Sequence, residues 1–220
     1  TMLNNDGGFF NEDGTLAIAT NERNVEALQW LSDLVTDGSV DPASPGYSGD
    51  DKKAAFYRGD AAFMLASPGA HLESSDEVNA DVAILPPLEG PHGDKGTVVW
   101  VNNIMMYEQT EHPAEAETFL QWWSENQLPL WTDGHARQIP ARSSFVEPVG
   151  GDDELYLQIV DQYLPVGRGM NSSVPGIFPA LNTFEGDGAL TTLAQRIFQG
   201  VPVDEALDQV VPRMTEILEQ

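Results

Sequence analysis

The sequence has no cysteine, few basic side chains and no long hydrophobic run. Without cysteine there is no disulfide framework, no thiolate nucleophile and no cysteine-ligated zinc site. The longest apolar run, residues 61–66, is far too short to span a bilayer, and residues 1–6 lack the basic and apolar regions of a signal peptide. Lys and Arg together number 10 against 35 acidic side chains, which argues against a nucleic acid or an anionic membrane surface as a partner.

Acidic side chains are in excess, and they are spread along the whole chain, giving a formal net charge of −25. Hydrophobic residues make up 41% of the 220 residues, enough for a core, so the acid does not mark a disordered tail. Such a surface stays soluble when salt screens its charges and repels itself when salt is low. We interpret it as adaptation to high salt. An ordinary acidic secreted protein is the alternative, and mimicry of nucleic acid is weaker because the core segments are regular.

Apolar spacing and turn residues predict helices alternating with strands, which is typical of an α/β fold. Buried strands are expected at residues 61–65 and 82–85, and a long strand is expected at residues 97–107. Helices are expected between a Thr20 or Asn21 cap and Gly38, from an Asp50 or Asp51 cap to Gly59, from Pro113, at about residues 153–164, near residues 187–199 and at residues 203–218.

The familiar catalytic and cofactor motifs are missing from the sequence, including the P-loop, the dinucleotide fingerprint, HExxH and GxSxG. Residues 11–14 and 185–188 resemble calcium loops only superficially, because neither has alternating oxygen ligands and a closing glutamate. The histidines at 71, 92, 112 and 135 have no metal-ligand spacing. We therefore expect no metal and no cofactor. A carboxylate pair of the glycosidase type carries little weight, because such pairs arise by chance among 35 acids.

Several segments occur in an order that belongs to a known family. Residues 5–10 with Asp13-Gly14 resemble a turn before a long helix, and residues 55–64 resemble a helix–turn–strand unit. The further matching segments are residues 82–86 with Gly90-Pro91, residues 112–120, the loop 134–142 with its Pro-Ala-Arg run, and residues 200–207. At this spacing, the chain resembles the C-terminal half of an extracellular solute-binding protein of the carbohydrate ABC importers, the family of the maltose- and maltooligosaccharide-binding proteins.

The resemblance implies a periplasmic-binding-protein-like, two-lobed α/β fold, of which this chain would be the C-terminal lobe plus a segment of the N-terminal lobe. Residues 1–99 and 148–220 would form the C-terminal lobe, and residues 100–147 would form the crossover and the segment that packs on the N-terminal lobe. The rest of that lobe, an export signal and a lipid attachment site would lie in a longer parent chain. The helix from Pro113 would then lose packing partners, and Phe119 and Trp123 are expected to be exposed or rearranged.

The implied function is ligand capture rather than catalysis. The family captures a sugar or oligosaccharide in a cleft between lobes and delivers it to membrane ABC permease subunits. The resemblance thus implies an extracellular, monomeric receptor, anchored as a lipoprotein to the outer face of the cell membrane. Two alternatives stay open. The same fold could bind an amino acid, a polyamine or a metal–anion complex, or the chain could be a carboxylate-pair glycosidase.

Aromatic side chains stack on the C–H faces of a sugar, and polar side chains bind its hydroxyls. The resemblance places Phe184 at an aromatic ligand position next to Glu185, and a core residue at a helix start is the alternative. A second family aromatic, which follows a proline, is absent because Gly69 follows Pro68. The nearest polar candidates there are Ser67 and His71.

Three further positions are candidates for ligand contact. Trp100 lies beside Asn102 on the expected crossover strand, and packing at the hinge is the alternative. Tyr47 lies in a loop before a helix, and Arg137 lies in the loop attributed to the other lobe. The remaining tryptophans are interpreted as core or lobe-packing residues, namely Trp30, Trp122, Trp123 and Trp131.

Overall fold

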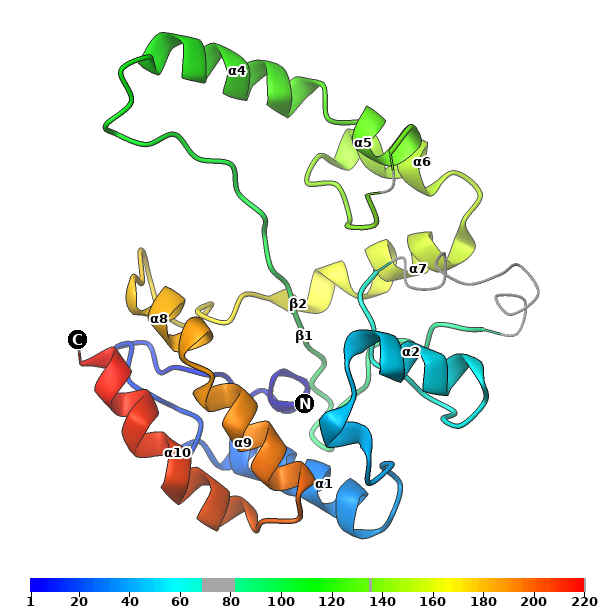
Figure 1. The fold of residues 1–220 in the computed structure, drawn as a ribbon, viewed down its shortest axis with the longest axis vertical. Coiled ribbons are helices and arrows are strands. Elements are labelled where there is room, and N and C mark those ends of the chain that lie inside the picture. Colours follow the sequence, from blue (N-terminus) through cyan, green and yellow to red (C-terminus); the bar gives the residue numbers. More distant parts are fainter. Residues whose placement is uncertain (69–81, 135, 220) are drawn as a thin grey trace. The chain divides into compact units, whose positions relative to one another are not determined.

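The computed structural model of the chain describes residues 1–68, 82–134 and 136–219. The chain forms two compact units, each assembled from segments that are distant in the sequence (Figure 1). Unit 1 comprises Thr1–Met64, Leu85–Val99 and Pro165–Gln220, and unit 2 comprises Leu65–Ile84 and Trp100–Leu164. Long-range packing, rather than one continuous stretch of chain, therefore builds each unit.

Unit 1 is mostly helical because its apolar residues recur every three or four positions. The last helix, α10 (Val203–Leu218), buries such a stripe: Val203, Ala206, Leu207, Val210, Met214 and Ile217. Asn21 caps α1 (Glu22–Thr36), its side-chain oxygen accepting the N–H of Arg23 at 2.9 Å. The helices predicted after Asn21 and at the C-terminus are confirmed. The other elements are η1 (Met2–Asn5), α1 (Glu22–Thr36), η2 (Ser44–Gly46), α2 (Gly49–Tyr57), α8 (Ala180–Asp187) and α9 (Ala189–Phe198).

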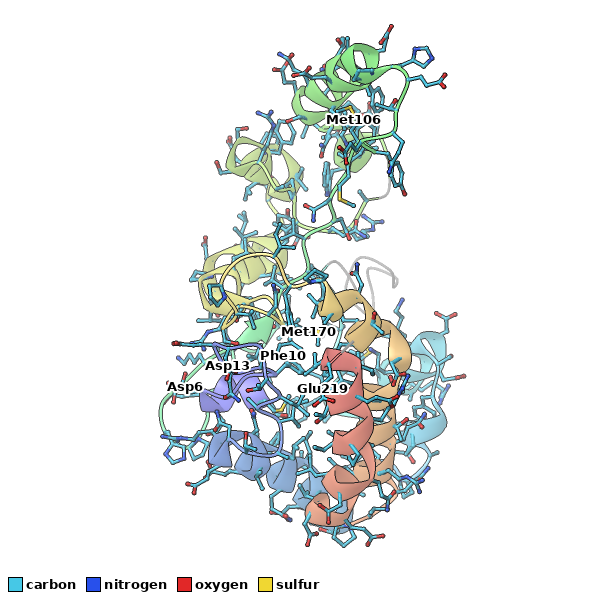
Figure 2. The ribbon with its side chains drawn as sticks, turned by 90° about the vertical axis from the view of Figure 1, so that its left-hand side faces the viewer. Asp6, Phe10, Asp13, Met106, Met170 and Glu219 are labelled. Carbon is cyan, nitrogen blue, oxygen red and sulfur yellow. The ribbon has the colours of Figure 1, made fainter. Side chains whose placement is uncertain are left out.

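The core of unit 1 lies where α9 and α10 pack on each other and on α1. Phe10 and Met170, both labelled in Figure 2, belong to this core together with the buried faces of the helices. The Phe10 ring packs edge-on against Phe178 and Phe184, with 4.9 Å between ring centroids in each pair. Such pairs add about 0.5–1.5 kcal/mol beyond the area they bury. The aromatic cluster therefore joins the N-terminal segment to α8.

One buried polar side chain, Asn24 on α1, also holds the N-terminal segment in place. Its amide nitrogen donates to the carbonyls of Gly8 at 2.7 Å and Ala17 at 3.0 Å, and its oxygen accepts the N–H of Gly8 at 3.1 Å. A Cβ at Gly7 would run into this side chain, so the close approach of the backbone requires glycine there. The Gly7-Gly8 pair, a turn signal in the sequence, thus also serves a packing contact.

The strands differ most from the sequence-based expectation. Strand β1 (Thr97–Val98) pairs in parallel with β2 (Gly167–Arg168), the only sheet in the described part of the chain. The strand expected at 97–107 is therefore two residues long. No strand forms at 61–65 or 82–85, and Phe63 and Leu65 are exposed. These predictions were wrong because a strand needs a partner for its backbone groups, and an apolar run does not by itself supply one.

Two helix boundaries in unit 1 also differ from the prediction. Helix α2 starts after Ser48, not after Asp50 or Asp51. The Ser48 hydroxyl oxygen accepts the N–H of Asp51 at 3.1 Å, and the Asp51 carboxylate accepts the N–H of Ser48 at 3.0 Å, a reciprocal capping box. Helix α8 occupies a stretch in which no helix was expected. Gly188, with φ of 89°, separates α8 from α9.

Unit 2 consists of short helices and extended segments. The predicted helices from Pro113 and at about 153–164 are confirmed, and the expected exposure of Phe119 is confirmed at 48%. Trp123 is half-buried, and its ring stacks on Phe119 with 6.0 Å between centroids. Trp122, and Trp30 in unit 1, are exposed and are not core residues. The elements are α4 (Pro113–Glu125), α5 (Pro129–Thr132), η4 (Ser143–Phe145), α6 (Val146–Gly150) and α7 (Glu154–Gln162), and η5 (Leu164–Val166) leads into β2.

Candidate functional site

The ligand residues predicted from the sequence fall in both units. Trp100 and Asn102 share one extended segment, and the other candidates come from separate elements. Tyr47, Phe184 and Glu185 belong to unit 1, and Ser67, Trp100, Asn102 and Arg137 belong to unit 2. His71 lies outside the described residues, so its role stays a prediction.

A small hollow of about 200 Å³ opens beside Tyr47 in unit 1. The tyrosine follows η2 and precedes the capping box of α2, so hydrogen-bonded turns fix its backbone on both sides. The aromatic ring of Tyr47 and the hydroxyl of Ser44 at this hollow match the C–H faces and the hydroxyls of a sugar. It is lined by Ser44, Tyr47, Ser48, Gly49 and Lys52.

The Tyr47 hydroxyl is oriented by the carboxylate of Asp41. It donates to Asp41 Oδ2 at 2.6 Å, and Asp41 Oδ1 accepts the N–H of Ala43 at 2.9 Å. The bond from Tyr47, and then the bond from Ala43, lower the pKa of Asp41, and the same hydroxyl–carboxylate bond raises the pKa of Tyr47. At neutral pH the pair is a phenol donor held by a carboxylate. Asp41 keeps lone pairs that can accept from a ligand hydroxyl.

Phe184 lies within the core of unit 1. Its side chain is 1% exposed, it sits inside α8 rather than ahead of a helix, and its ring packs on Phe10. In this structure the ring has no open face on which a sugar could stack. The alternative interpretation, a core residue, describes its packing. Glu185, the next residue on α8, is exposed.

Trp100 presents the most open aromatic face among the predicted site residues that the structure describes. Its side chain is 67% exposed, and it follows β1 with one residue between them. Asn102, two residues later, is also exposed. An exposed indole ring near an amide can stack on a sugar face and bind its hydroxyls. Because the expected strand ends at Val98, Trp100 and Asn102 do not belong to a sheet in the described structure.

Ser67 and Arg137 occupy two other loops of unit 2. Ser67 is exposed, and Arg137 is half-buried between α5 and η4. Backbone on both sides of Arg137 is anchored: the indole N–H of Trp131 donates to the Gln138 carbonyl at 2.5 Å, and the Ala136 N–H donates to the Leu130 carbonyl at 3.1 Å. The loop therefore holds the position of Arg137 through its neighbours.

Sequence reasoning missed the residues that surround Tyr47. Asp41 was not a candidate, and the expected caps of the following helix were Asp50 or Asp51 rather than Ser48. A serine three residues before an acid, ahead of a helical stretch, is the capping-box signal that locates this turn. The polar lining of the hollow by Ser44 and Lys52 carries no comparable sequence signal, because it depends on how the loop folds back.

The loops that superficially resemble calcium sites have other contacts. Asp13 accepts hydrogen bonds from the hydroxyl of Thr15 at 2.6 Å and from its N–H at 3.0 Å, and these bonds lower the pKa of Asp13. Asp187 pairs with Arg213 at 2.7 Å. In residues 1–68, 82–134 and 136–219, no group of three or more His, Asp or Glu side chains is placed to hold a metal ion. No helix in those ranges is long and apolar enough to cross a bilayer.

Comparison with known proteins identifies a family, and two of the solved structures that resemble the chain bear on its fold and ligand. The family model of the bacterial extracellular solute-binding proteins matches residues 1–127. A sugar transporter from Arthrobacter chlorophenolicus A6, solved with bound laminaribiose, is 30% identical with a TM-score of 0.85; the match covers 100% of this chain and 56% of that chain. Maltose-bound MalE3 of T. maritima is 19% identical with a TM-score of 0.71, over 98% of this chain and 55% of that chain. No curated protein matches the sequence.

The chain spans little more than half the length of these solved relatives. The likeness to MalE3, at 19% identity, bears on the fold alone. The predicted periplasmic-binding-protein-like fold class is confirmed by both structures. The family match covers more than half of the chain, and the relative at 30% identity is matched along all of it. The chain therefore belongs to the family of bacterial extracellular solute-binding proteins.

Proposed function

We propose that this protein is a receptor that captures a sugar or oligosaccharide between two lobes and delivers it to a membrane ABC permease. The observation that carries the proposal is the 30% identity, over the whole chain, to a sugar transporter that holds laminaribiose. Laminaribiose is accordingly the first ligand to test. Maltose, held by the more distant relative, is the second.

The chemistry of the described side chains supports a sugar ligand. The Tyr47–Asp41 pair offers acceptor lone pairs and an aromatic ring, and Trp100 with Asn102 offers a stacking face and an amide. Closure of two lobes excludes water and strengthens each polar contact with the ligand. The proposed ligand-binding residues are Tyr47, Ser67, Trp100, Asn102, Arg137 and Glu185. Their role is to bind and orient the sugar, without a catalytic step.

The proposal places the protein outside the cytoplasm, as a monomeric lipoprotein on the outer face of the membrane. The description of the matched family, extracellular solute binding, supports this location. The net charge of −25 supports a salt-rich setting, because only screening relieves the mutual repulsion of so many carboxylates.

A thermal-shift measurement on the protein with both lobes, in molar salt, tests the proposal. A ligand that binds only the native state at 100 times its Kd adds about 2.7 kcal/mol of stability. The entropy of unfolding scales with length, so for a two-lobed protein nearly twice as long as this chain the added stability corresponds to a rise in Tm of about 3 °C. We expect such a rise with laminaribiose or another oligosaccharide. A rise with polyamines or amino acids alone would keep the fold and overturn the ligand class.

Two matched variants test the site, and one assay tests the enzyme alternative. Tyr47→Phe removes the hydroxyl that Asp41 orients and is expected to weaken sugar binding by about 0.5–1.5 kcal/mol, the net value of one neutral hydrogen bond. Tyr107→Phe removes a hydroxyl elsewhere and is expected to bind sugar as the parent does. Equal affinity for all three proteins would remove Tyr47 from the site. Hydrolysis of aryl glycosides that is lost when one specific acidic residue is mutated would show that the protein is a glycosidase rather than a receptor.

A further inference from the structure

One motif in the loop between β2 and α8 has no role in the proposed function. Asn171-Ser172-Ser173 matches the acceptor sequence for N-linked glycosylation, Asn-X-Ser or Asn-X-Thr. No other asparagine in the sequence has serine or threonine two residues later. Such a triplet also occurs by chance in proteins of any location. It points to a glycan only where the fold leaves the asparagine open and the protein leaves the cytoplasm.

The triplet lies on two overlapping turns at the surface of unit 1. It directly follows Met170, a core residue labelled in Figure 2. The Ser172 N–H donates to the Gly169 carbonyl at 3.1 Å. The Val174 N–H donates to the Asn171 carbonyl at 2.9 Å. Ser172 is exposed and Asn171 is partly exposed, so the backbone is held in a surface turn where a bulky substituent has room.

The side-chain amide of Asn171 is available for modification. In residues 1–68, 82–134 and 136–219, no hydrogen bond involves this amide. Two buried asparagines differ in this respect. The amide nitrogen of Asn5 donates to the Arg23 carbonyl at 2.9 Å, and that of Asn24 donates to the Gly8 carbonyl at 2.7 Å. The fold therefore uses the nitrogens of Asn5 and Asn24 and leaves the nitrogen of Asn171 open to react.

The third residue of the triplet is anchored to the core. The Ser173 hydroxyl donates to the carbonyl of Phe10 at 2.7 Å, and Phe10 is 3% exposed. Serine and threonine are the two residues allowed at this position, and they share the hydroxyl, so the transferase has to engage it. Because the folded protein uses this hydroxyl internally, a glycan has to be added before the loop docks on Phe10.

The loop around the triplet differs from the rest of the surface in its charge. Residues 169–184 form the longest stretch of the sequence without a charged side chain, in a chain with a net charge of −25. Ile177 in this stretch is 94% exposed. Carboxylates keep an acidic surface in solution, whereas this loop exposes an apolar group and no charge. A glycan is bulky and solubilising, so at Asn171 it supplies hydration that the loop itself lacks.

We propose that Asn171 carries an N-linked glycan, added to the exported chain before unit 1 folds. The donor is an oligosaccharide whose first sugar is bound through C1 to a polyprenyl phosphate or diphosphate. The Asn171 amide nitrogen forms a bond to C1 and gives up one proton. The bond between C1 and the phosphate oxygen breaks, and the lipid phosphate leaves with the electron pair, so no oxidant or reductant takes part. This inference rests on the proposed location outside the cytoplasm.

Mass spectrometry of the protein isolated from the cells that make it tests the inference. Trypsin is expected to release residues 169–196, because Arg168 and Arg196 bound this peptide. We expect the peptide to carry the mass of whole sugar residues, located on Asn171 by fragmentation. The unmodified peptide alone, or sugar on a serine hydroxyl instead, would overturn the inference. Cell fractionation separates the two proposals: an unmodified protein outside the cytoplasm refutes only the glycan, and an unmodified protein in the cytoplasm refutes both.

Matched variants made in the same cells identify the acceptor. Asn171→Gln removes the acceptor and is expected to lose the sugar mass entirely. Asn182→Gln changes an exposed asparagine outside the motif and is expected to keep it. Ser173→Thr retains the hydroxyl and is expected to retain the glycan, whereas Ser173→Ala is expected to lose it. Sugar that persists in Asn171→Gln would contradict the assignment.

The order of glycosylation and folding is tested on unmodified protein made in cells that lack the transferase. Membranes from the native cells are expected to glycosylate a peptide of residues 165–179 at least about tenfold faster than this folded protein, because the fold holds the Ser173 hydroxyl on Phe10 and releases it only when the loop opens. Equal rates for the peptide and the folded protein would refute addition before folding.

Discussion

Replacing Phe184 by alanine tests whether this ring is a core residue or a ligand contact. The side chain is 1% exposed, packs edge-on against Phe10 and belongs to the core cluster of α9 and α10. Phe→Ala at such a site costs about 3–5 kcal/mol through lost burial and the cavity left behind. Total stabilities are about 5–15 kcal/mol, so the loss is a large fraction. With a urea m-value near 2 kcal/mol/M, the unfolding midpoint is expected to fall by about 1.5–2.5 M.

Urea unfolding followed by circular dichroism, with sugar affinity measured on the folded fraction, provides the assay. Phe63→Ala in unit 1 is the control, because that ring is 74% exposed and its truncation is expected to cost about 1 kcal/mol or less. The opposite pattern would refute the packing argument. A Phe184→Ala protein with parental stability and weakened sugar binding would place the ring in the ligand site.

Three further predictions concern stability. Raising salt from about 0.1 M to 2 M is expected to raise the Tm, because screening reduces the repulsion within a net charge of −25; a Tm that falls with salt would contradict the salt-adaptation interpretation. Asn24→Ala is expected to lower the free energy of unfolding in denaturant by about 2–4 kcal/mol, because it leaves backbone groups of Gly8 and Ala17 without their hydrogen-bond partner. Its control, Gln29→Ala on the exposed face of α1, is expected to lower it by about 0.5 kcal/mol or less. Burial, and then the charge of Asp153, raise the pKa of Tyr156 to about 12. This folded-state pKa exceeds the unfolded value of about 10. The contribution of protonated Tyr156 to the free energy of unfolding is therefore fully present below pH 10 and is lost as pH rises toward 12. Ultraviolet titration of Tyr156 against its Phe variant checks this, and ionisation near pH 10 in the folded protein would contradict it.

The helices were predictable from the sequence because their signals are local. Asn21, the apolar spacing of α1 and the stripe of α10 each lie within a few turns of chain. The strands were not predictable in the same way, since the strand expected at 97–107 depends on a partner that the described chain supplies only as far as Val99. An apolar run indicates that a segment is buried, and it becomes a strand only where a neighbouring strand pairs with its backbone.

The candidate site shows the same division between local and long-range information. Tyr47 was identified from its place before a helix, but its hydrogen bond to Asp41 depends on how residues 41–47 fold back. Phe184 illustrates the opposite case, because an aromatic residue near a family position was interpreted as a ligand contact and is buried against Phe10, which is distant in sequence. Residue type and spacing suggest chemistry, and packing decides whether a side chain is open to a ligand.

Calorimetric titration of the protein with both lobes tests the central claim, capture of a sugar, most directly. With laminaribiose, then maltose, in molar salt, the account predicts saturable binding of one sugar per protein molecule, with Kd of about 1 μM or tighter for the preferred oligosaccharide, a free energy near −8 kcal/mol. No heat with any oligosaccharide on protein shown to be folded, together with saturable binding of a polyamine or an amino acid, would contradict the sugar receptor while leaving the family assignment intact.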